Sequence, residues 1–242
     1  PVAGNNAELA MFYYKRGQTA AHLGRGHQAL ADYNKAAELF ELANNKWMQV
    51  GAIEAAAYIT SYLGNYSDSI KGVLKSIEVR KLIPGDYEEL EENLVTQRLV
   101  LAAMAAEGGD YSLAEQALKR ARPGVNIVRY SPYWKTKGKV AVQTLYFTAS
   151  ALVLAARGEL DEAEAFMRNA VNQWEPYKGS VLSSFDSKLP ARQYAWYLRN
   201  LAAVLIAQGQ YVEAEVTARE ALLLMLSHYG RYSWYVAWSL DL

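Results

Sequence analysis

The sequence predicts an all-α fold, a solenoid of about five antiparallel helix pairs plus a C-terminal helix, forming a single domain over residues 1–242. Two observations predict this fold. A glycine-centred motif recurs five times along the chain, and small side chains recur at fixed distances from each glycine. The stretches between the motifs are rich in alanine, leucine, glutamate and glutamine, which favour helices, and they lack the sustained alternation typical of strands.

The motif glycines mark the expected turn inside each pair. They are Gly24, Gly64, Gly109, Gly158 and Gly209, with separations of 40, 45, 49 and 51 residues. Glycine readily adopts the left-handed backbone conformation that ends a helix. Each glycine is therefore expected to end the first helix of a pair.

Small residues stand seven positions before, five positions after and twelve positions after each motif glycine. Small side chains allow two helices to approach closely, so this spacing indicates a tightly packed antiparallel pair. In chain order for the three positions, the residues are Gly17, Ala57, Ala102, Ala151 and Ala202; Ala29, Ser69, Ala114, Ala163 and Ala214; and Ala36, Ser76, Ala121, Ala170 and Ala221.

The helix pairs follow in order from these positions. They are expected near 6–22 with 26–44, 47–63 with 66–82, 88–107 with 110–121, 139–157 with 160–174, and 190–208 with 211–228. The prolines between these pairs lie outside the expected helix cores, where proline is tolerated. These prolines are Pro84, Pro123, Pro132, Pro176 and Pro190.

Two connections and the C-terminal stretch complete the expected outline. The connections 122–138 and 175–189 are long and aromatic, and long loops in compact domains are often functional. The simpler interpretation is that they cover the ends of the helix layer. An eleventh helix is expected near Ser233, and the apolar stretch that runs to Leu242 favours a fragment of a longer protein.

The motif resembles the tetratricopeptide repeat over about residues 8 to 228. Its fifth copy contains Leu198, Ala202, Gly209, Tyr211, Ala214, Ala218 and Ala221. The spacing exceeds the usual 34 residues or so of this repeat, so the chain is similar to the long-repeat variety of large bacterial sensor and signalling proteins. The resemblance implies a right-handed superhelix whose concave face binds a protein segment.

The resemblance also implies which residues face such a ligand, because the first helix of each pair lines the concave face in this family. Asn200 resembles a position where the family places an amide against the ligand backbone, and an amide both donates and accepts hydrogen bonds. Tyr14 and Gln18 stand where a lysine and an asparagine would clamp a peptide carboxylate, which argues against that mode. The groove candidates are Tyr14, Gln18, Glu54, Tyr58, Thr148, Trp196, Arg199 and Asn200.

Composition argues against several other classes of function. The chain has 25 basic and 25 acidic residues and a formal net charge of zero, which disfavours general attraction to nucleic acid or membranes. It has no cysteine and three histidines, and neither a metal-ligand set nor a nucleophile–histidine pair can be assembled. No apolar run approaches the roughly 20 residues that span a bilayer. We therefore expect no enzyme, no cofactor, no metal site and no membrane insertion.

A basic segment provides an alternative. No acidic residue lies between Glu115 and Glu159, and aromatic residues interleave with the cations there. Such a segment would suit a nucleic-acid or small-molecule sensor, although a solvated loop that balances the acidic run 86–92 explains it more simply. The basic residues are Lys119, Arg120, Arg122, Arg129, Lys135, Lys137 and Lys139.

The stretch 229–238 holds five aromatic residues and suggests either the first helix of a sixth repeat or a self-association surface. The leading interpretation of the whole chain is a protein-interaction scaffold. It would be the regulatory or adaptor part of a larger bacterial protein, with the cytoplasm favoured over the periplasm or the exterior.

Overall fold

The structure, a computed structural model, describes residues 5–85, 87–131, 135–179 and 189–229, together with Arg231, Ser233 and Val236. Within these residues the chain forms ten α-helices and one short 3-10 helix. In chain order they are α1 (Asn5–His22), α2 (Gly26–Leu42), α3 (Lys46–Tyr62), α4 (Tyr66–Lys81), α5 (Tyr87–Glu107), α6 (Tyr111–Tyr130), α7 (Thr136–Ala156), α8 (Leu160–Trp174), η1 (Glu175–Tyr177), α9 (Leu189–Ala207) and α10 (Tyr211–Tyr229).

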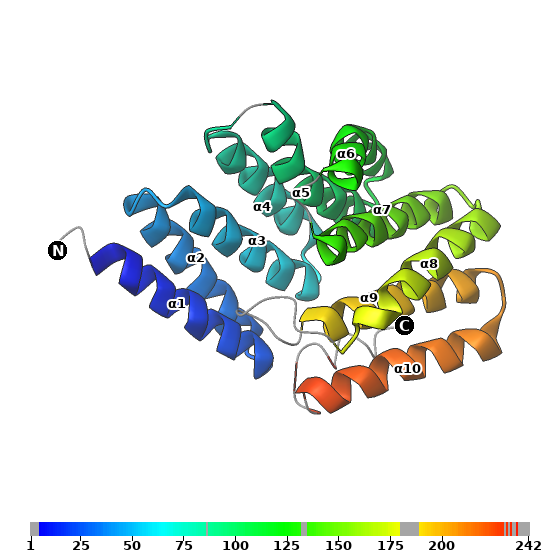
Figure 1. Cartoon of the computed structure of the whole chain (residues 1–242). Helices are drawn as coiled ribbons and strands as arrows, with labels where there is room; N and C mark the ends of the chain where they lie inside the picture. The colour runs from blue at the N-terminus through cyan, green and yellow to red at the C-terminus, as the bar shows by residue number, and fades with distance from the viewer. Residues whose placement is uncertain are drawn as a thin grey trace.

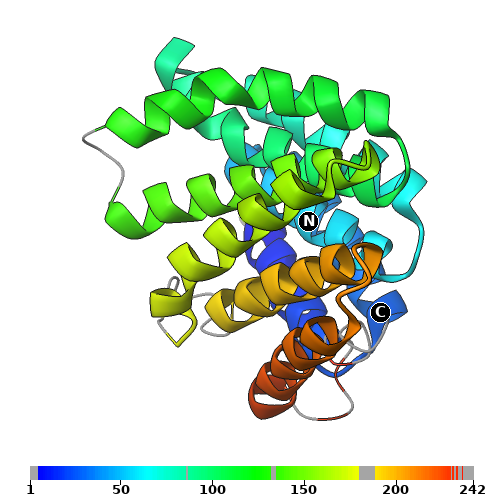
Figure 2. The same cartoon turned by 90° about the vertical axis from the view of Figure 1, so that its right-hand side faces the viewer.

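Consecutive helices pack as five antiparallel pairs, and each pair packs against the next. The pairs follow one another around a curve that begins with α1–α2 and ends with α9–α10 (Figure 1). Turned by 90°, the later pairs lie as successive layers with the N-terminal helices behind them (Figure 2). The all-α solenoid of five helix pairs is confirmed, with most helix ends within a few residues of their expected positions.

The five motif glycines end the first helices as predicted. Their φ angles lie between 74° and 83°, in the left-handed region. At the turn between α3 and α4, the Gly64 nitrogen donates to the Ser61 carbonyl at 2.9 Å and the Asn65 nitrogen donates to the Thr60 carbonyl at 3.1 Å. These bonds satisfy carbonyls that the end of a helix would leave unpaired. The turn between α2 and α3 uses Asn44 instead, with φ 52°, and no glycine marks it in the sequence.

The small residues lie where helices touch, and all fifteen are buried. A Cβ added at Gly17 would lie 3.1 Å from the ring of Tyr33 on α2, which shows how closely α1 and α2 approach. The Ser69 hydroxyl on α4 donates to the Ala57 carbonyl on α3 at 2.9 Å. A larger side chain at these positions would force the helices of a pair apart.

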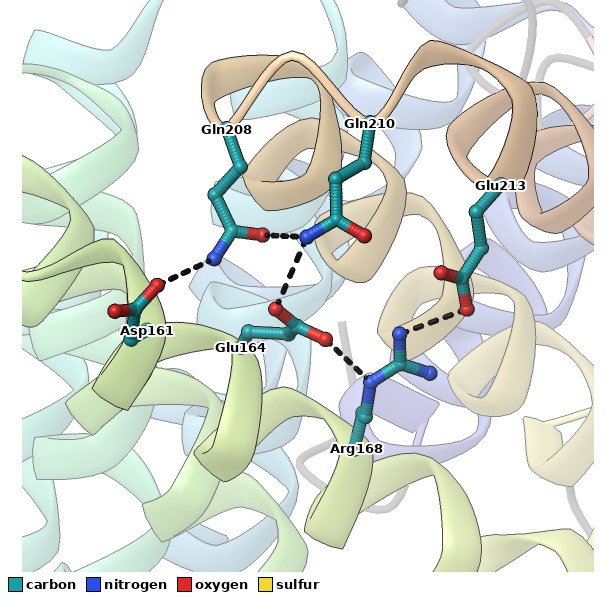
Figure 3. Close-up of polar contacts among 6 residues, drawn as sticks. All are labelled: Asp161, Glu164, Arg168, Gln208, Gln210 and Glu213. Carbon is teal, nitrogen blue, oxygen red and sulfur yellow. Dashed lines mark hydrogen bonds and ion pairs between the residues drawn. The ribbon is translucent and has the colours of Figure 1, made fainter.

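Polar side chains join the fourth pair to the fifth on the outer surface. Figure 3 shows Arg168 of α8 between two carboxylates, bonded to Glu164 at 2.6 Å and to Glu213 of α10 at 2.7 Å. In the turn between α9 and α10, Gln208 donates to Asp161 at 3.1 Å and Gln210 donates to Glu164 at 3.4 Å. This network links α8 to the turn of the following pair.

Helix α6 corrects two predictions. The second helix of the third pair was expected to end near residue 121, with Pro123 outside it, but α6 continues to Tyr130 with Pro123 inside. Gly124 packs so closely on α5 that an added Cβ would lie 2.7 Å from the Glu91 carbonyl oxygen. Arg98 of α5 donates to the Arg120 carbonyl at 2.9 Å, near the break that proline makes in the helix ladder. Packing on α5 therefore carries the helix past the proline.

The expected connection 122–138 is accordingly short, since α7 begins at Thr136. The connection after α8 begins with η1, and residues 180–188 lie outside the described part of the chain. The expected eleventh helix also lies largely outside it. Of that stretch, the structure describes Ser233 and Val236, both 3% exposed.

Helix α7 corrects the expectation about apolar runs. Gly138–Ala156 is long and apolar enough to cross a membrane by length and composition alone, and 44% of its most apolar window is buried within the fold. The helix packs against α5, α6 and α8, and less extensively against α9. This is the position of a core helix in the stack.

Candidate binding cavity

A cavity of about 510 Å³ opens on the inner side of the curved stack. Its wall contains residues from the first helix of every pair, namely α1, α3, α5, α7 and α9, with one tyrosine each from α2 and α4. The volume lies within the range of ligand sites, roughly 300–1,000 Å³. The repeat architecture therefore brings residues more than 180 positions apart in the sequence to one surface.

Five of the eight groove candidates line this cavity. Tyr14 and Gln18 come from α1, Glu54 and Tyr58 from α3, and Trp196 from α9. On each of the first two helices the pair is four residues apart, so both side chains project from the same face. Their location agrees with the expectation, while a binding role for them stays a prediction.

The other three candidates do not line the cavity. Thr148 is fully buried, and its hydroxyl donates to the Thr144 carbonyl at 2.9 Å. Asn200 is 2% exposed, and its amide donates to the Trp196 carbonyl at 2.9 Å. The expected place of Asn200 against a ligand backbone is thus corrected, because its amide is bonded within its own helix. Arg199 lies beside the site and acts electrostatically on Glu107.

Aromatic rings dominate the wall. The rings of Tyr14 and Tyr33 lie 5.5 Å apart, and the same distance separates Trp196 from the buried Tyr197. Tyr58 remains 38% exposed, toward the cavity that it lines. Aromatic side chains supply large contact areas with few rotatable bonds, which suits a binding surface.

Glu54 is one of two carboxylates in the wall. Its Oε1 accepts a hydrogen bond from Gln97 Nε2 at 2.8 Å and lies 3.9 Å from the Nη2 of Arg80. The Arg80 guanidinium in turn lies over the ring of Trp47, 4.5 Å from its centre. Burial raises the pKa of Glu54, and the bond from Gln97 and the charge of Arg80 only partly oppose this.

Glu107 is the second carboxylate, at the last residue of α5. Its Oε1 accepts a hydrogen bond from Trp196 Nε1 at 3.3 Å, which ties α5 to α9 across the curve. Burial raises the pKa of Glu107 against the opposing effects of Arg199 and of the indole bond.

Sequence reasoning missed several wall residues. His22 and Tyr62 continue the predicted rows by one further step of four residues, to the ends of α1 and α3. Helical spacing could have identified both. Arg192 likewise lies one step of four residues before Trp196 on α9, whereas Glu107 carried no comparable signal because no candidate on α5 was named.

The predicted basic segment lies away from the cavity. Lys119, Arg120, Arg122 and Arg129 are exposed on α6, the second helix of its pair, and none of them lines the cavity. Lys135 precedes α7 and is exposed, and Lys139 is partly buried in its first turn. Tyr133, Trp134 and the side chain of Lys137 lie outside what the structure describes.

A second hollow of about 440 Å³ lies beside α10. It is lined by residues of α9, α10 and the segment after η1, and Lys178 sits 5.0 Å from the ring centre of Tyr194 there. No predicted site residue contributes to it. Over the described ranges, no group of three or more His, Cys, Asp or Glu is placed to hold a metal ion.

Comparisons with known proteins agree with the repeat. Residues 149–169 and 195–220, in the fourth and fifth pairs, match the tetratricopeptide repeat family. No curated protein matches the sequence.

Several solved structures share the fold. A Rap protein complexed with competence and sporulation factor superimposes with a TM-score of 0.65 at 14% identity, covering 96% of this chain and 56% of that one. The apo form of RapI gives 0.54 at 16% identity, covering 90% and 70%. TPR-like repeats of a kinesin light chain from Podosopora anserina give 0.53 at 13% identity, covering 92% and 96%.

At these identities the likeness concerns the fold alone, and the chain spans just over half the length of the first Rap protein. The fourth and fifth pairs thus match tetratricopeptide repeats in sequence, and the whole chain shares the stacked helix-pair fold of these structures.

Proposed function

We propose that this protein is a binding scaffold that takes a short protein segment in its inner cavity. The observation that carries the proposal is the wall itself, since one enclosed surface gathers aromatic and polar side chains from the first helix of all five pairs. Such a surface can bury apolar side chains of a ligand while a few polar groups fix its register.

The cavity volume of about 510 Å³ limits the ligand. It suits a short linear peptide, or the anchoring side chains of a longer one, and excludes a folded domain. The Rap structure complexed with competence and sporulation factor is a protein of similar fold that binds a ligand, which supports the proposal by analogy. We further propose that the scaffold is the regulatory or adaptor part of a larger bacterial protein; this chain covers 56% of the Rap protein of similar fold.

Gly51 provides a sharp test of where a ligand binds. It lies in the middle of α3, lines the cavity, and a Cβ added to it would meet no atom within 4 Å. Gly51→Trp should therefore fill the cavity without disturbing the helix, whereas Gly51→Ala leaves the space open and serves as the matched control.

The probe is a random linear heptapeptide library displayed with free N-termini and selected on the wild-type protein. Affinities of the selected peptides are then measured by fluorescence anisotropy. We expect Gly51→Trp to weaken binding at least tenfold and Gly51→Ala to preserve it. Failure to select any peptide, or equal binding to both variants, would contradict the proposal.

A further inference from the structure

We propose that the cavity selects ligands that carry a positively charged group, an ammonium or a guanidinium, which Glu54 and Glu107 recognise among the tyrosine rings. This inference rests on the proposed function and names the chemistry of the ligand.

Among the residues that line the cavity, acidic side chains outnumber basic ones. Of the lining residues that the structure describes, Glu54 and Glu107 are acidic, Arg192 is basic and His22 carries an imidazole. With the imidazole neutral, the wall holds one more negative than positive charge. Beside the low-dielectric interior of the protein, this imbalance favours a cationic guest.

Glu54 keeps the capacity to bind such a group. Its nearest cation, Arg80, is not a lining residue; it lies 3.9 Å away at the limit of an ion pair and is stacked on Trp47. A carboxylate offers about four acceptor positions on its two oxygens. Hydrogen bonds from Gln97 and Ser76 occupy two of them, so the carboxylate can still accept donors from the cavity side.

The carboxylate charge of Glu107 is less well compensated by hydrogen bonds. Its hydrogen bond from the Trp196 indole is 3.3 Å long, well beyond the roughly 2.7–2.9 Å of strong charged bonds. It also ends α5, where the negative end of the helix dipole favours a nearby cation. The charge of Arg199, which does not line the cavity, opposes this negative potential, but burial outweighs it, since the pKa of Glu107 is raised.

The aromatic wall favours the same guest. Tyr14, Tyr33, Tyr58 and Tyr62 line the cavity with Trp196, and the faces of such rings attract cations within about 6 Å. Burial also raises the pKa of both carboxyl groups, because the surrounding protein stabilises their charge less than water does. A ligand cation would supply the missing stabilisation.

The test uses heptapeptides selected on the wild-type protein, each resynthesised in matched forms. Citrulline replaces arginine, norleucine replaces lysine, and acetylation removes the N-terminal charge. We expect at least a tenfold loss of affinity in the form that lacks the recognised charge, and this form distinguishes a side-chain cation from the N-terminal ammonium.

Protein variants complete the experiment. Glu54→Gln and Glu107→Gln keep the shape and an acceptor oxygen, and each should weaken binding of the charged form at least fivefold and the neutral form hardly at all. Glu162→Gln, exposed on α8, is the control and should change neither. Circular dichroism establishes that each variant is folded.

The outcomes separate the two proposals. If neutral and charged forms bind equally and Gly51→Trp blocks both, the cavity binds peptides but the charge inference is overturned. If Gly51→Trp leaves binding intact, the cavity is not the site and both proposals fail.

Discussion

The imidazole ring of His22 lies 5.5 Å from the phenol ring of Tyr229, with the ring planes at 62° to each other. His22 ends α1 and Tyr229 ends α10, so the first and fifth helix pairs touch although more than 200 residues separate these two side chains. His22 also lines the cavity. The contact therefore closes the curve of the stack beside the candidate site.

Removing this contact should destabilise the fold. Tyr229→Ala deletes a ring pair, an arrangement that stabilises by about 0.5–1.5 kcal/mol beyond the burial of its area. We expect urea unfolding to show a loss of about 1–2 kcal/mol, since Tyr229 also packs against the buried core of the later pairs. Tyr130→Ala is the control. Tyr130 ends α6 and is 78% exposed, so this variant should lose less than about 0.5 kcal/mol. Equal losses would show that the contact between α1 and α10 contributes nothing.

One substitution should have opposite effects at two glycines. Gly209 has φ 78° at the turn between α9 and α10, whereas Gly51 is helical, and an added Cβ meets no atom within 4 Å at either position. We expect Gly209→Ala to lower the free energy of unfolding by about 1–2 kcal/mol because an L-residue is strained there. Gly51→Ala should raise it by about 0.5–1 kcal/mol through helix propensity. Thermal and urea unfolding measure both, and a loss at Gly51 would contradict the helical argument.

The stability of the protein should depend on Glu107. Since its pKa is raised in the folded state, the folded protein binds this proton more tightly than the unfolded chain. The associated stability is fully present below the ordinary value of 4.5 and is lost as pH rises through the raised pKa. Glu107→Gln should therefore unfold at a higher temperature than the wild type at pH 7, with the difference shrinking toward pH 4. A lower unfolding temperature at pH 7 would mean that the attraction of Arg199 outweighs desolvation.

The joint between the fourth and fifth pairs can be tested by comparing an arginine that crosses it with an arginine that does not. Arg168 pairs with Glu164 and with Glu213 of the next pair, while Arg219 pairs with Glu215 on its own helix. Both sites are substantially exposed, so small effects are expected. We expect Arg168→Met to cost about 0.5–1 kcal/mol and Arg219→Met less than about 0.5 kcal/mol. The excess for Arg168 should shrink in 1 M salt, and its persistence there would assign it to packing instead.

Much of the fold could be predicted because the repeat depends on local properties. Gly64 and its equivalents need a left-handed backbone, and Ala163 and its equivalents need a short side chain, and both requirements are visible in the sequence. The run of α6 past Pro123 was missed because Gly124 packs on α5, a contact that no local rule reveals.

The candidate site was predictable only in part for the same reason. The resemblance to the tetratricopeptide repeat placed Tyr14, Gln18 and Tyr58 on the concave face, yet it could not tell which turn of each helix the cavity reaches. On α9 the wall extends from Arg192 to Trp196 and stops before Asn200, which faces the interior. That limit depends on the angle between pairs, which individual residues do not encode.

The touching ends of the stack have a mechanical consequence. In an open superhelix, the angle at each joint between pairs can change independently of the others. Here a change of angle at one joint must be matched at another, or the ring of His22 must separate from that of Tyr229. An occupant that changes the angle at one joint would accordingly strain this ring contact.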